Sequence, residues 1–230
     1  MKKVIGILGG MGPAATADMF QKFIQLTSAK RDQDHIPLVI SSIPDIPDRT
    51  ACILRDGEDP QPFMEQYVNG LKAAGATCVI IACNTAHYWF DKLKKSCDVE
   101  MLSMIDATAE AVRQSGKQKV GILATDATLA TGLYKKKIES YGLTFIQPTQ
   151  EGQQQVMQSI YALKAGEIEN SKQLMLKQRD ELVKQGAEII ILGCTEVPIV
   201  LAQEVEKQPD LYVDSTLALV KAAIQWYQTH

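Results

Sequence analysis

Short apolar runs alternate with longer amphipathic segments along the whole chain. The apolar runs are continuous, which is typical of strands buried on both faces of a parallel sheet. Strands are expected at 3–8, 37–43, 78–82, 100–104, 119–124, 143–146, 187–192 and 211–213. Helices are expected at 13–30, 60–74, from 86 onwards, 106–114, 126–141, 151–164, 168–185, from 197 onwards and 214–227. This alternation predicts an α/β fold with parallel sheets and helices on both faces.

The chain contains an internal repeat. Residues 70–85 read GLKAAGATCVIIACNT and residues 181–196 read ELVKQGAEIIILGCTE, at an offset of 111 positions. VIGILGG at 4–10 resembles KVGILAT at 119–125. Such a repeat predicts two similar three-layer α/β lobes related by a pseudo-two-fold axis, with the active-site cleft between them. We expect the last strand and helix to cross back, so that the lobes comprise 1–105 plus 211–230, and 106–210.

Composition and charge exclude several classes of partner. The net charge is −3 and no basic run is present, which argues against nucleic acid as a partner. No apolar run is long enough to cross a bilayer. The opening MKKVIGILGGMGP is too short and glycine-broken for a signal peptide, so we expect a cytoplasmic protein.

Five cysteines without an export signal do not indicate a disulfide framework, and no cysteine or histidine cluster has metal-ligand spacing. Cys83 and Cys194 occupy the same place in the two repeat copies, at the carboxyl end of an expected strand. Ligands of open α/β sheets bind beyond the carboxyl ends of the strands. A helix is expected to start after each cysteine, and its dipole should lower the pKa of the thiol. Cys52, Cys78 and Cys97 are interpreted as structural.

Two thiols across a cleft suit the inversion of a carbon centre, because one thiolate removes a proton while the other thiol returns one to the opposite face. The neighbours Asn84, Thr85 and Thr195 could hold a substrate carboxylate. His87 is interpreted as a helix-surface histidine and is not included in the site.

The turn Gly9-Gly10-Met11-Gly12-Pro13 follows the first strand. Its spacing does not match the dinucleotide fingerprint. Its backbone amides could face an anionic ligand. Met11 and Gly12 are therefore candidate substrate-binding residues, as is Thr125 at the equivalent point of the second half.

The motifs Ala-Cys-Asn-Thr and Gly-Cys-Thr resemble the two signatures of the aspartate/glutamate racemase superfamily, and the resemblance covers the whole chain. The Gly-Gly-Met-Gly opening and Glu196, where glutamate racemases have histidine, are similar to the aspartate racemase branch. The resemblance implies a homodimer that racemises a small amino acid, aspartate first and glutamate second, without a cofactor or metal. It also implies that Arg49 and Lys164 bind substrate carboxylates. Arg49 lies in PDIPDRT at 44–50, which is expected to be a proline-stiffened loop after the second strand.

Alternative functions share this scaffold. Broad-specificity amino-acid racemases are the main alternative, since the motifs do not fix side-chain recognition. Hydantoin racemases and maleate isomerases also remain open, whereas arylmalonate decarboxylases need only one of the two cysteines. A two-lobed binding protein for a small acid would leave the cysteine pair unexplained.

Overall fold

The computed structural model describes residues 3–229, which fall into two compact units. Unit 1 comprises the described residues up to Ala107 and from Thr216 onwards, and unit 2 comprises Thr108–Ser215. The chain therefore passes between the units twice. No helix of the described residues is both long and apolar enough to cross a membrane.

Unit 1 is built on a parallel four-stranded sheet in the order β2-β1-β3-β4. Its central strands are apolar and fully buried, because helices cover both faces. The register pairs Ile5 of β1 with both Leu38 of β2 and Cys78 of β3. The strands are β1 (Ile5–Leu8), β2 (Leu38–Ser41), β3 (Cys78–Ile81) and β4 (Glu100–Met101).

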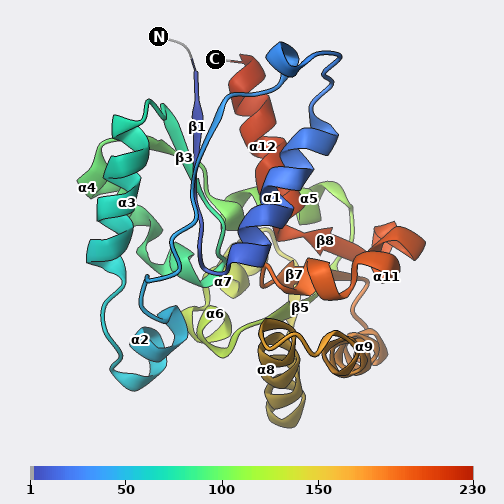
Figure 1. The fold of residues 1–230 in the computed structure, drawn as a ribbon. Helices are drawn as coiled ribbons and strands as arrows, with labels where there is room; N and C mark the ends of the chain where they lie inside the picture. The colour runs from blue at the N-terminus through green and yellow to red at the C-terminus, as the bar shows by residue number, and fades with distance from the viewer. Residues whose placement is uncertain (1–2, 230) are drawn as a thin grey trace. The chain divides into compact units, whose positions relative to one another are not determined.

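Two hydrophobic cores lie on the two faces of this sheet. One contains Val68 of α3 and Leu93 of α4 packed on β1 and β3, and the other contains Met19 of α1 and Leu219 of α12. Figure 1 shows these helices around the blue and green strands. The helices of unit 1 are α1 (Pro13–Leu26), η1 (Asp32–Asp34), α2 (Arg49–Arg55), α3 (Gln61–Ala73), η2 (Thr85–Trp89), α4 (Phe90–Cys97) and α12 (Ser215–Thr229), which starts at the last residue of unit 2.

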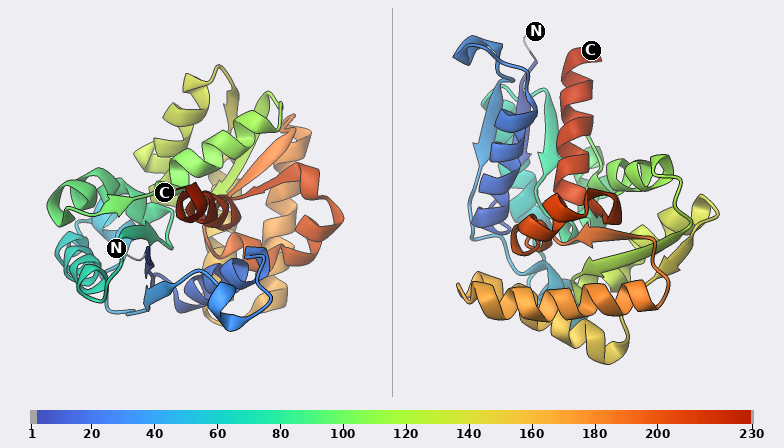
Figure 2. Two further views of the ribbon diagram at one scale, coloured as in Figure 1. Left: turned by 90° about the horizontal axis from the view of Figure 1, so that it is seen from above. Right: turned by 90° about the vertical axis from the view of Figure 1, so that its right-hand side faces the viewer.

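Unit 2 repeats this architecture with a parallel sheet in the order β6-β5-β7-β8. The strands are β5 (Lys119–Ala124), β6 (Thr144–Ile146), β7 (Ile189–Gly193) and β8 (Tyr212–Asp214). The helices are α6 (Asp126–Thr131), α7 (Leu133–Ser140), α8 (Gln150–Lys164), α9 (Ile168–Lys184), α10 (Val197–Val200), α11 (Ala202–Lys207) and η3 (Pro209–Leu211). The long helices α8 and α9 pack against each other, as Figure 2 shows. Two four-stranded parallel sheets with flanking helices confirm the predicted fold class.

The last strand corrects one expected lobe boundary. The prediction assigned 211–230 to the first lobe, but β8 pairs with β7 in the second sheet, in register from Ile190↔Tyr212 to Leu192↔Asp214. Only the helix that follows, α12, belongs to unit 1. The chain passes from unit 1 to unit 2 within α5 (Met104–Gln114): β4 belongs to unit 1, whereas most of α5 belongs to unit 2.

Two helices differ from the expected pattern. The segment around Arg49 was expected to be a loop, but α2 begins there because the Asp48 side chain caps it, accepting a hydrogen bond from the Ala51 backbone at 2.6 Å. The expected helix 126–141 is two helices, α6 and α7, broken at Gly132 with φ +64°.

Candidate active site

Cys83 lies just beyond the carboxyl end of β3. The strand alignment continues to Ala82, whose backbone N–H donates to the Leu8 carbonyl at 2.9 Å, and Cys83 comes next. Cys83 is buried and belongs to the same hydrophobic cluster as Met11 and Ile46. The predicted site residues Cys83 and Met11 are therefore brought together within unit 1.

Cys194 occupies the equivalent position after β7. Its thiol donates a hydrogen bond to Oε2 of Glu196 at 3.0 Å, and Thr195 Oγ1 donates to the same oxygen at 3.3 Å. Lys164 Nζ lies 3.5 Å from the other carboxylate oxygen. Glu196 is only 5% exposed, so this carboxylate is a buried acceptor shared by a thiol, a hydroxyl and an ammonium group.

The expectation of a lowered thiol pKa is wrong for Cys194. Burial, and then the negative charge of Glu196, raise the pKa of this thiol well above its ordinary value. The helix that follows, α10, has a single turn of four residues, and its dipole does not outweigh these two causes. Cys194 therefore rests as a thiol that is hydrogen-bonded to the Glu196 carboxylate.

His87 is buried rather than on a helix surface, which corrects its interpretation from the sequence. Its Nε2 accepts from the Met104 backbone N–H at 3.0 Å, so Nδ1 carries the proton and donates to the Cys83 carbonyl at 2.8 Å. Burial lowers the pKa of His87 to about 4. A neutral imidazole with both nitrogens engaged is not an acid or base here; it ties the Cys83 turn to the start of α5.

The buried His87 should make stability depend on pH. Its folded-state pKa of about 4 lies below its ordinary value of 6.5, so the unfolded chain binds the extra proton between these values. The free energy of unfolding should therefore fall as pH drops from about 6.5 to about 4, by about 3 kcal/mol. Denaturant unfolding across this range should show the fall in the wild type and a clearly smaller one in His87→Gln. Equal slopes in both proteins would contradict the assignment.

Arg49, at the start of α2, is held in place through only part of its guanidinium group. Nη1 donates to the carbonyls of Ile46 at 2.8 Å and Pro47 at 2.9 Å. Nε is buried and has no hydrogen-bond partner within residues 3–229. A fixed guanidinium with a buried donor still available suits a carboxylate ligand.

The turn after β1 needs its glycines. Gly10 has φ +85°, and a Cβ there would lie 2.2 Å from the Ile43 carbonyl oxygen. Gly12 then caps α1 in an extended conformation. The remaining predicted site residues also lie at the carboxyl ends of the strands. Asn84 directly precedes η2 and Thr85 begins it. Thr125 caps α6 by accepting a hydrogen bond from the Thr128 backbone at 3.1 Å.

Glu196 is a candidate site residue that sequence reasoning missed. From the sequence, this residue stands out only because glutamate racemases have histidine at the same position. A carboxylate two positions after a candidate catalytic cysteine was a usable signal, because a thiol needs a nearby base to become a thiolate. Of the other cysteines, Cys78 lies within β3, where burial raises the pKa of its thiol to about 12, in keeping with a structural role.

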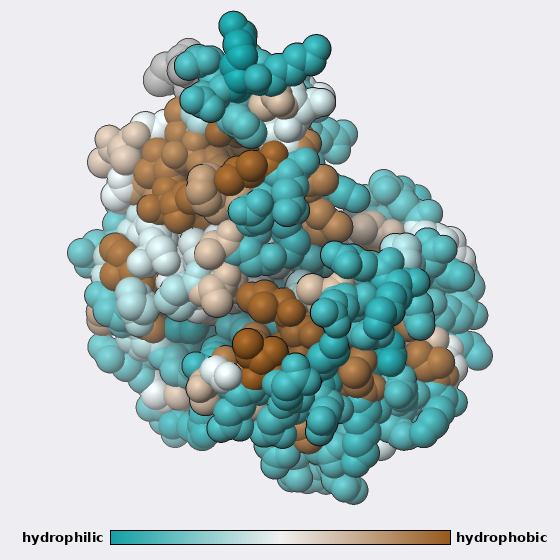
Figure 3. Space-filling model, turned by 45° about the vertical axis from the view of Figure 1, so that its right-hand side comes forward, coloured by the Kyte–Doolittle hydropathy of each residue, from teal (hydrophilic) through white to brown (hydrophobic). Residues whose placement is uncertain are grey.

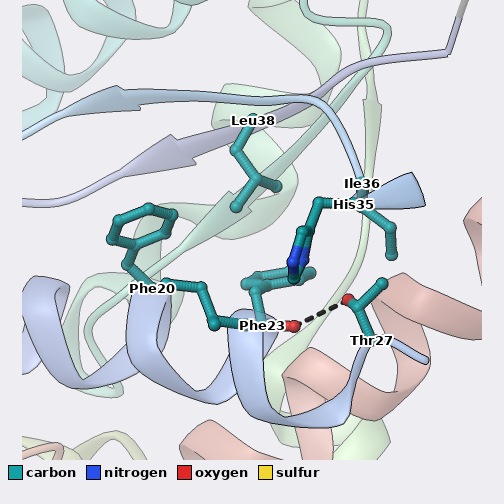
Figure 4. A pocket seen from close by; sticks show the side chains of 7 residues that line it. Phe20, Phe23, Thr27, His35, Ile36 and Leu38 are labelled. Carbon is teal, nitrogen blue, oxygen red and sulfur yellow. Dashed lines mark hydrogen bonds between the residues drawn. The ribbon is translucent and has the colours of Figure 1, made fainter. Parts of the chain in front are cut away.

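A separate pocket of about 250 Å³ in unit 1 is not a candidate for this chemistry. It is lined by Phe20 and Phe23 of α1 and by His35, Ile36 and Leu38, which precede or begin β2 (Figure 4). It therefore lies at the amino ends of the strands, whereas Cys83 lies at their carboxyl ends. Large apolar side chains of α1 remain exposed beside it. Figure 3 shows a broad hydrophobic area in the upper part of the view and smaller ones below it.

No group of three or more histidine, cysteine, aspartate or glutamate residues among residues 3–229 is placed to hold a metal ion. The polar groups at the carboxyl ends of the two sheets include thiols, hydroxyls, an amide, carboxylates, an ammonium group and a guanidinium. They can exchange protons and bind charged groups of a small molecule.

Comparison with known proteins shows which family the chain belongs to. The Asp/Glu/Hydantoin racemase family model matches residues 8–223. The structure is similar to that of Picrophilus torridus aspartate racemase, with a TM-score of 0.89 and 32% identity over 98% of this chain and 94% of that one. An aspartate racemase homologue from Pyrococcus horikoshii matches with a TM-score of 0.77 and 29% identity over 99% of this chain and 100% of that one.

The sequence is also similar to the broad specificity amino-acid racemase of Bacillus subtilis, at 28% identity over 97% of this chain and 98% of that protein. The family match includes both cysteine motifs and every strand except most of β1. The chain therefore belongs to the Asp/Glu/Hydantoin racemase family and is an isomerase of the racemase type.

Proposed function

We propose that this racemase acts on aspartate, with glutamate second, by a cofactor-independent mechanism in which Cys83 and Cys194 serve opposite faces of the α carbon. The observation that carries the proposal is the Cys194 thiol, which donates to the buried Glu196 carboxylate at 3.0 Å. The equivalent position of Cys83 in unit 1 supplies the second thiol.

In one direction, Glu196 takes the proton of Cys194, and the resulting thiolate removes the α proton of the substrate. The electron pair of the broken C–H bond passes into the α-carboxylate as an enediolate. The Cys83 thiol then donates its proton to the opposite face of the carbon, which leaves Cys83 as a thiolate. The reverse reaction starts from this state: the Cys83 thiolate removes the α proton, the Cys194 thiol donates its proton to the opposite face, and Glu196 returns its proton to Cys194. Each step only moves a proton, so no oxidant or reductant is consumed.

The developing enediolate needs hydrogen-bond donors that are already in place. The polar residues that follow the two cysteines, Asn84, Thr85 and Thr195, are buried at the carboxyl ends of the strands. Met11, Gly12 and Thr125 lie in turns at the same edges of their own sheets, where backbone amides can bind an anion. We assign these six residues to substrate binding.

Aspartate as substrate is supported by Arg49, whose buried Nε is a donor without a partner in the described structure. Lys164 is the second proposed cation. It pairs with Glu196 while its side chain is 42% exposed, so it can approach a ligand from the solvent side of that carboxylate. Similarity to an aspartate racemase supports the same substrate.

Arg49→Ala should lower kcat/KM for aspartate by about 10–100-fold, because a charge-assisted hydrogen bond to the side-chain carboxylate is lost. Turnover of a neutral amino acid such as alanine should change much less. Arg55→Ala, an exposed arginine in the same helix, is the matched control and should leave both substrates unaffected. Equal losses for aspartate and alanine would show that Arg49 is structural and would remove the main support for aspartate.

The second candidate function is broad-specificity amino-acid racemisation, which the similarity to the Bacillus subtilis enzyme favours. A panel of amino acids followed by polarimetry, with no cofactor added, distinguishes the two. Aspartate and glutamate should lose optical rotation fastest if the proposal is right. Comparable rates for neutral or basic amino acids would favour the broad-specificity alternative.

A further inference from the structure

We infer that Gln153 and Asp126 of unit 2 form the binding site for the α-ammonium group of the substrate. The inference rests on the proposed function, since it requires an amino-acid substrate. It adds two binding residues at the edge of the sheet that carries Cys194.

The amide of Gln153 has a fixed orientation. Its Nε2 donates to the Ala124 carbonyl at 3.0 Å and to Asp126 Oδ1 at 2.7 Å. Both partners are acceptors, so the NH₂ group must face them and the amide cannot be flipped. Oε1 is thereby directed away from these partners, and it is buried with no donor within the described residues.

A buried carbonyl oxygen without a donor is uncommon, because it has lost its bonds to water without replacement. Most such groups in folded proteins are satisfied by the protein, a water or a ligand. The Ala124 carbonyl and the Asp126 carboxylate, which bind the amide nitrogen of Gln153, are acceptors and cannot donate to Oε1. The missing donor must therefore come from another group.

The position of Gln153 places this acceptor beside the proposed chemistry. Ala124, which accepts from Gln153, is the last residue of β5 and is paired in register with Gly193 of β7. Cys194 follows Gly193 directly. The Gln153 amide is therefore hydrogen-bonded to β5, the strand next to β7, which the proposed catalytic Cys194 follows.

The chemistry of the pair fits an ammonium ion. A primary ammonium group has three donors and a positive charge, so it needs several acceptors and at least one anion. Asp126 supplies the anion, and Gln153 occupies only its Oδ1. Glu196, which also lies at the carboxyl edge of this sheet, is already engaged by Cys194, Thr195 and Lys164.

The test compares the binding of aspartate with that of succinate, which has both carboxylates but no amino group. Calorimetry on the full chain gives the ratio of the two Kd values. Gln153→Leu and Asp126→Asn should each reduce the preference for aspartate by about tenfold. Gln154→Leu, at an exposed position of the same helix, should leave the ratio unchanged.

The possible outcomes separate this inference from the proposed function. If the variants weaken aspartate and succinate equally, the residues are structural and the inference is wrong, while the racemase proposal stands. If the wild-type chain racemises another amino acid faster than aspartate, the same ratio of Kd values is measured with that amino acid and its analogue without the amino group. The same loss of preference is then expected in the variants. If the wild type racemises no amino acid, the proposed function fails and the ammonium site fails with it.

Discussion

Cys83→Ala should abolish racemisation of both enantiomers, with a loss in kcat/KM of about 10²–10⁴-fold or more, because a positioned acid or base is removed from the proton relay. Cys194→Ala should do the same. In each variant the loss must be equal in the two directions, since the equilibrium constant between enantiomers is one and fixes the ratio of the two kcat/KM values. Polarimetry started from each pure enantiomer measures both directions.

The cysteine variants should nevertheless retain one half of the reaction. With Cys83 replaced, the enantiomer whose α proton faces Cys194 can still be deprotonated and reprotonated on the same side. In deuterated water it should gain deuterium at the α carbon without inverting, while the other enantiomer stays unlabelled. Cys194→Ala should show the opposite preference, as measured by proton NMR. If one variant labels both enantiomers equally, a single base serves both faces and the two-thiol mechanism is wrong.

Glu196→Gln should reduce racemisation by about 10²-fold or more, because glutamine keeps the shape and an acceptor oxygen but cannot take the proton of Cys194. The structural reason is the 3.0 Å hydrogen bond from Cys194 to a carboxylate that is 5% exposed. The change should also bring the pKa of the Cys194 thiol closer to its ordinary value, since the charge of Glu196 is one of the causes that raise it.

Combining variants makes the test of Glu196 specific. Added to Cys83→Ala, Glu196→Gln should strongly slow labelling of the enantiomer that faces Cys194. Added to Cys194→Ala, it should leave labelling of the other enantiomer unchanged, because Glu196 assists only Cys194. Equal slowing in both backgrounds would mean that Glu196 supports the fold or the substrate rather than one thiol.

The fold could be predicted because the internal repeat and the continuous apolar strands are strong signals. The two sheets have the same strand order, and their central strands, β1 with β3 and β5 with β7, come from the repeated segments. The last strand was assigned to the wrong lobe because β8 has only three residues. Its apolar character shows that it is buried, but nothing in so short a run says which sheet it joins.

The sequence predicted helix boundaries wrongly at two places where a single residue caps or interrupts a helix. Asp48 caps α2 and lets a helix begin within a segment whose prolines suggested a loop. Gly132 interrupts a helix whose polar and apolar pattern continues across it. Both effects depend on the conformation of one residue, which a periodic pattern does not report.

The two cysteines could be proposed as catalytic from their positions in the repeat, whereas the raised pKa of Cys194 could not be predicted. Rules for helix ends favour a low thiol pKa, but for Cys194 burial and Glu196 outweigh the helix. The role of His87 likewise depends on two backbone partners, Cys83 and Met104, which lie 4 and 17 positions away along the chain. Contacts of this kind appear only once the chain is folded.

Gln153 and Arg49 show what the folded structure adds to the substrate question. Each has a buried polar atom without a partner within residues 3–229, an acceptor in Gln153 and a donor in Arg49. An amino-acid dicarboxylate carries the matching groups, an ammonium and a carboxylate. Neither unsatisfied atom could be predicted from the sequence, because whether an atom lacks a partner depends on how the rest of its side chain is held in the fold.

The most direct test of the two-thiol racemase is the initial labelling pattern of the wild-type protein with aspartate in deuterated water. If two thiols serve opposite faces, the product enantiomer receives deuterium from the second thiol, while the substrate that remains keeps its proton. Chiral separation of early samples followed by mass spectrometry should therefore find the label in the product alone. Deuterium appearing equally in recovered substrate and product from the start would show a single base, and would contradict the assignment of one cysteine to each face.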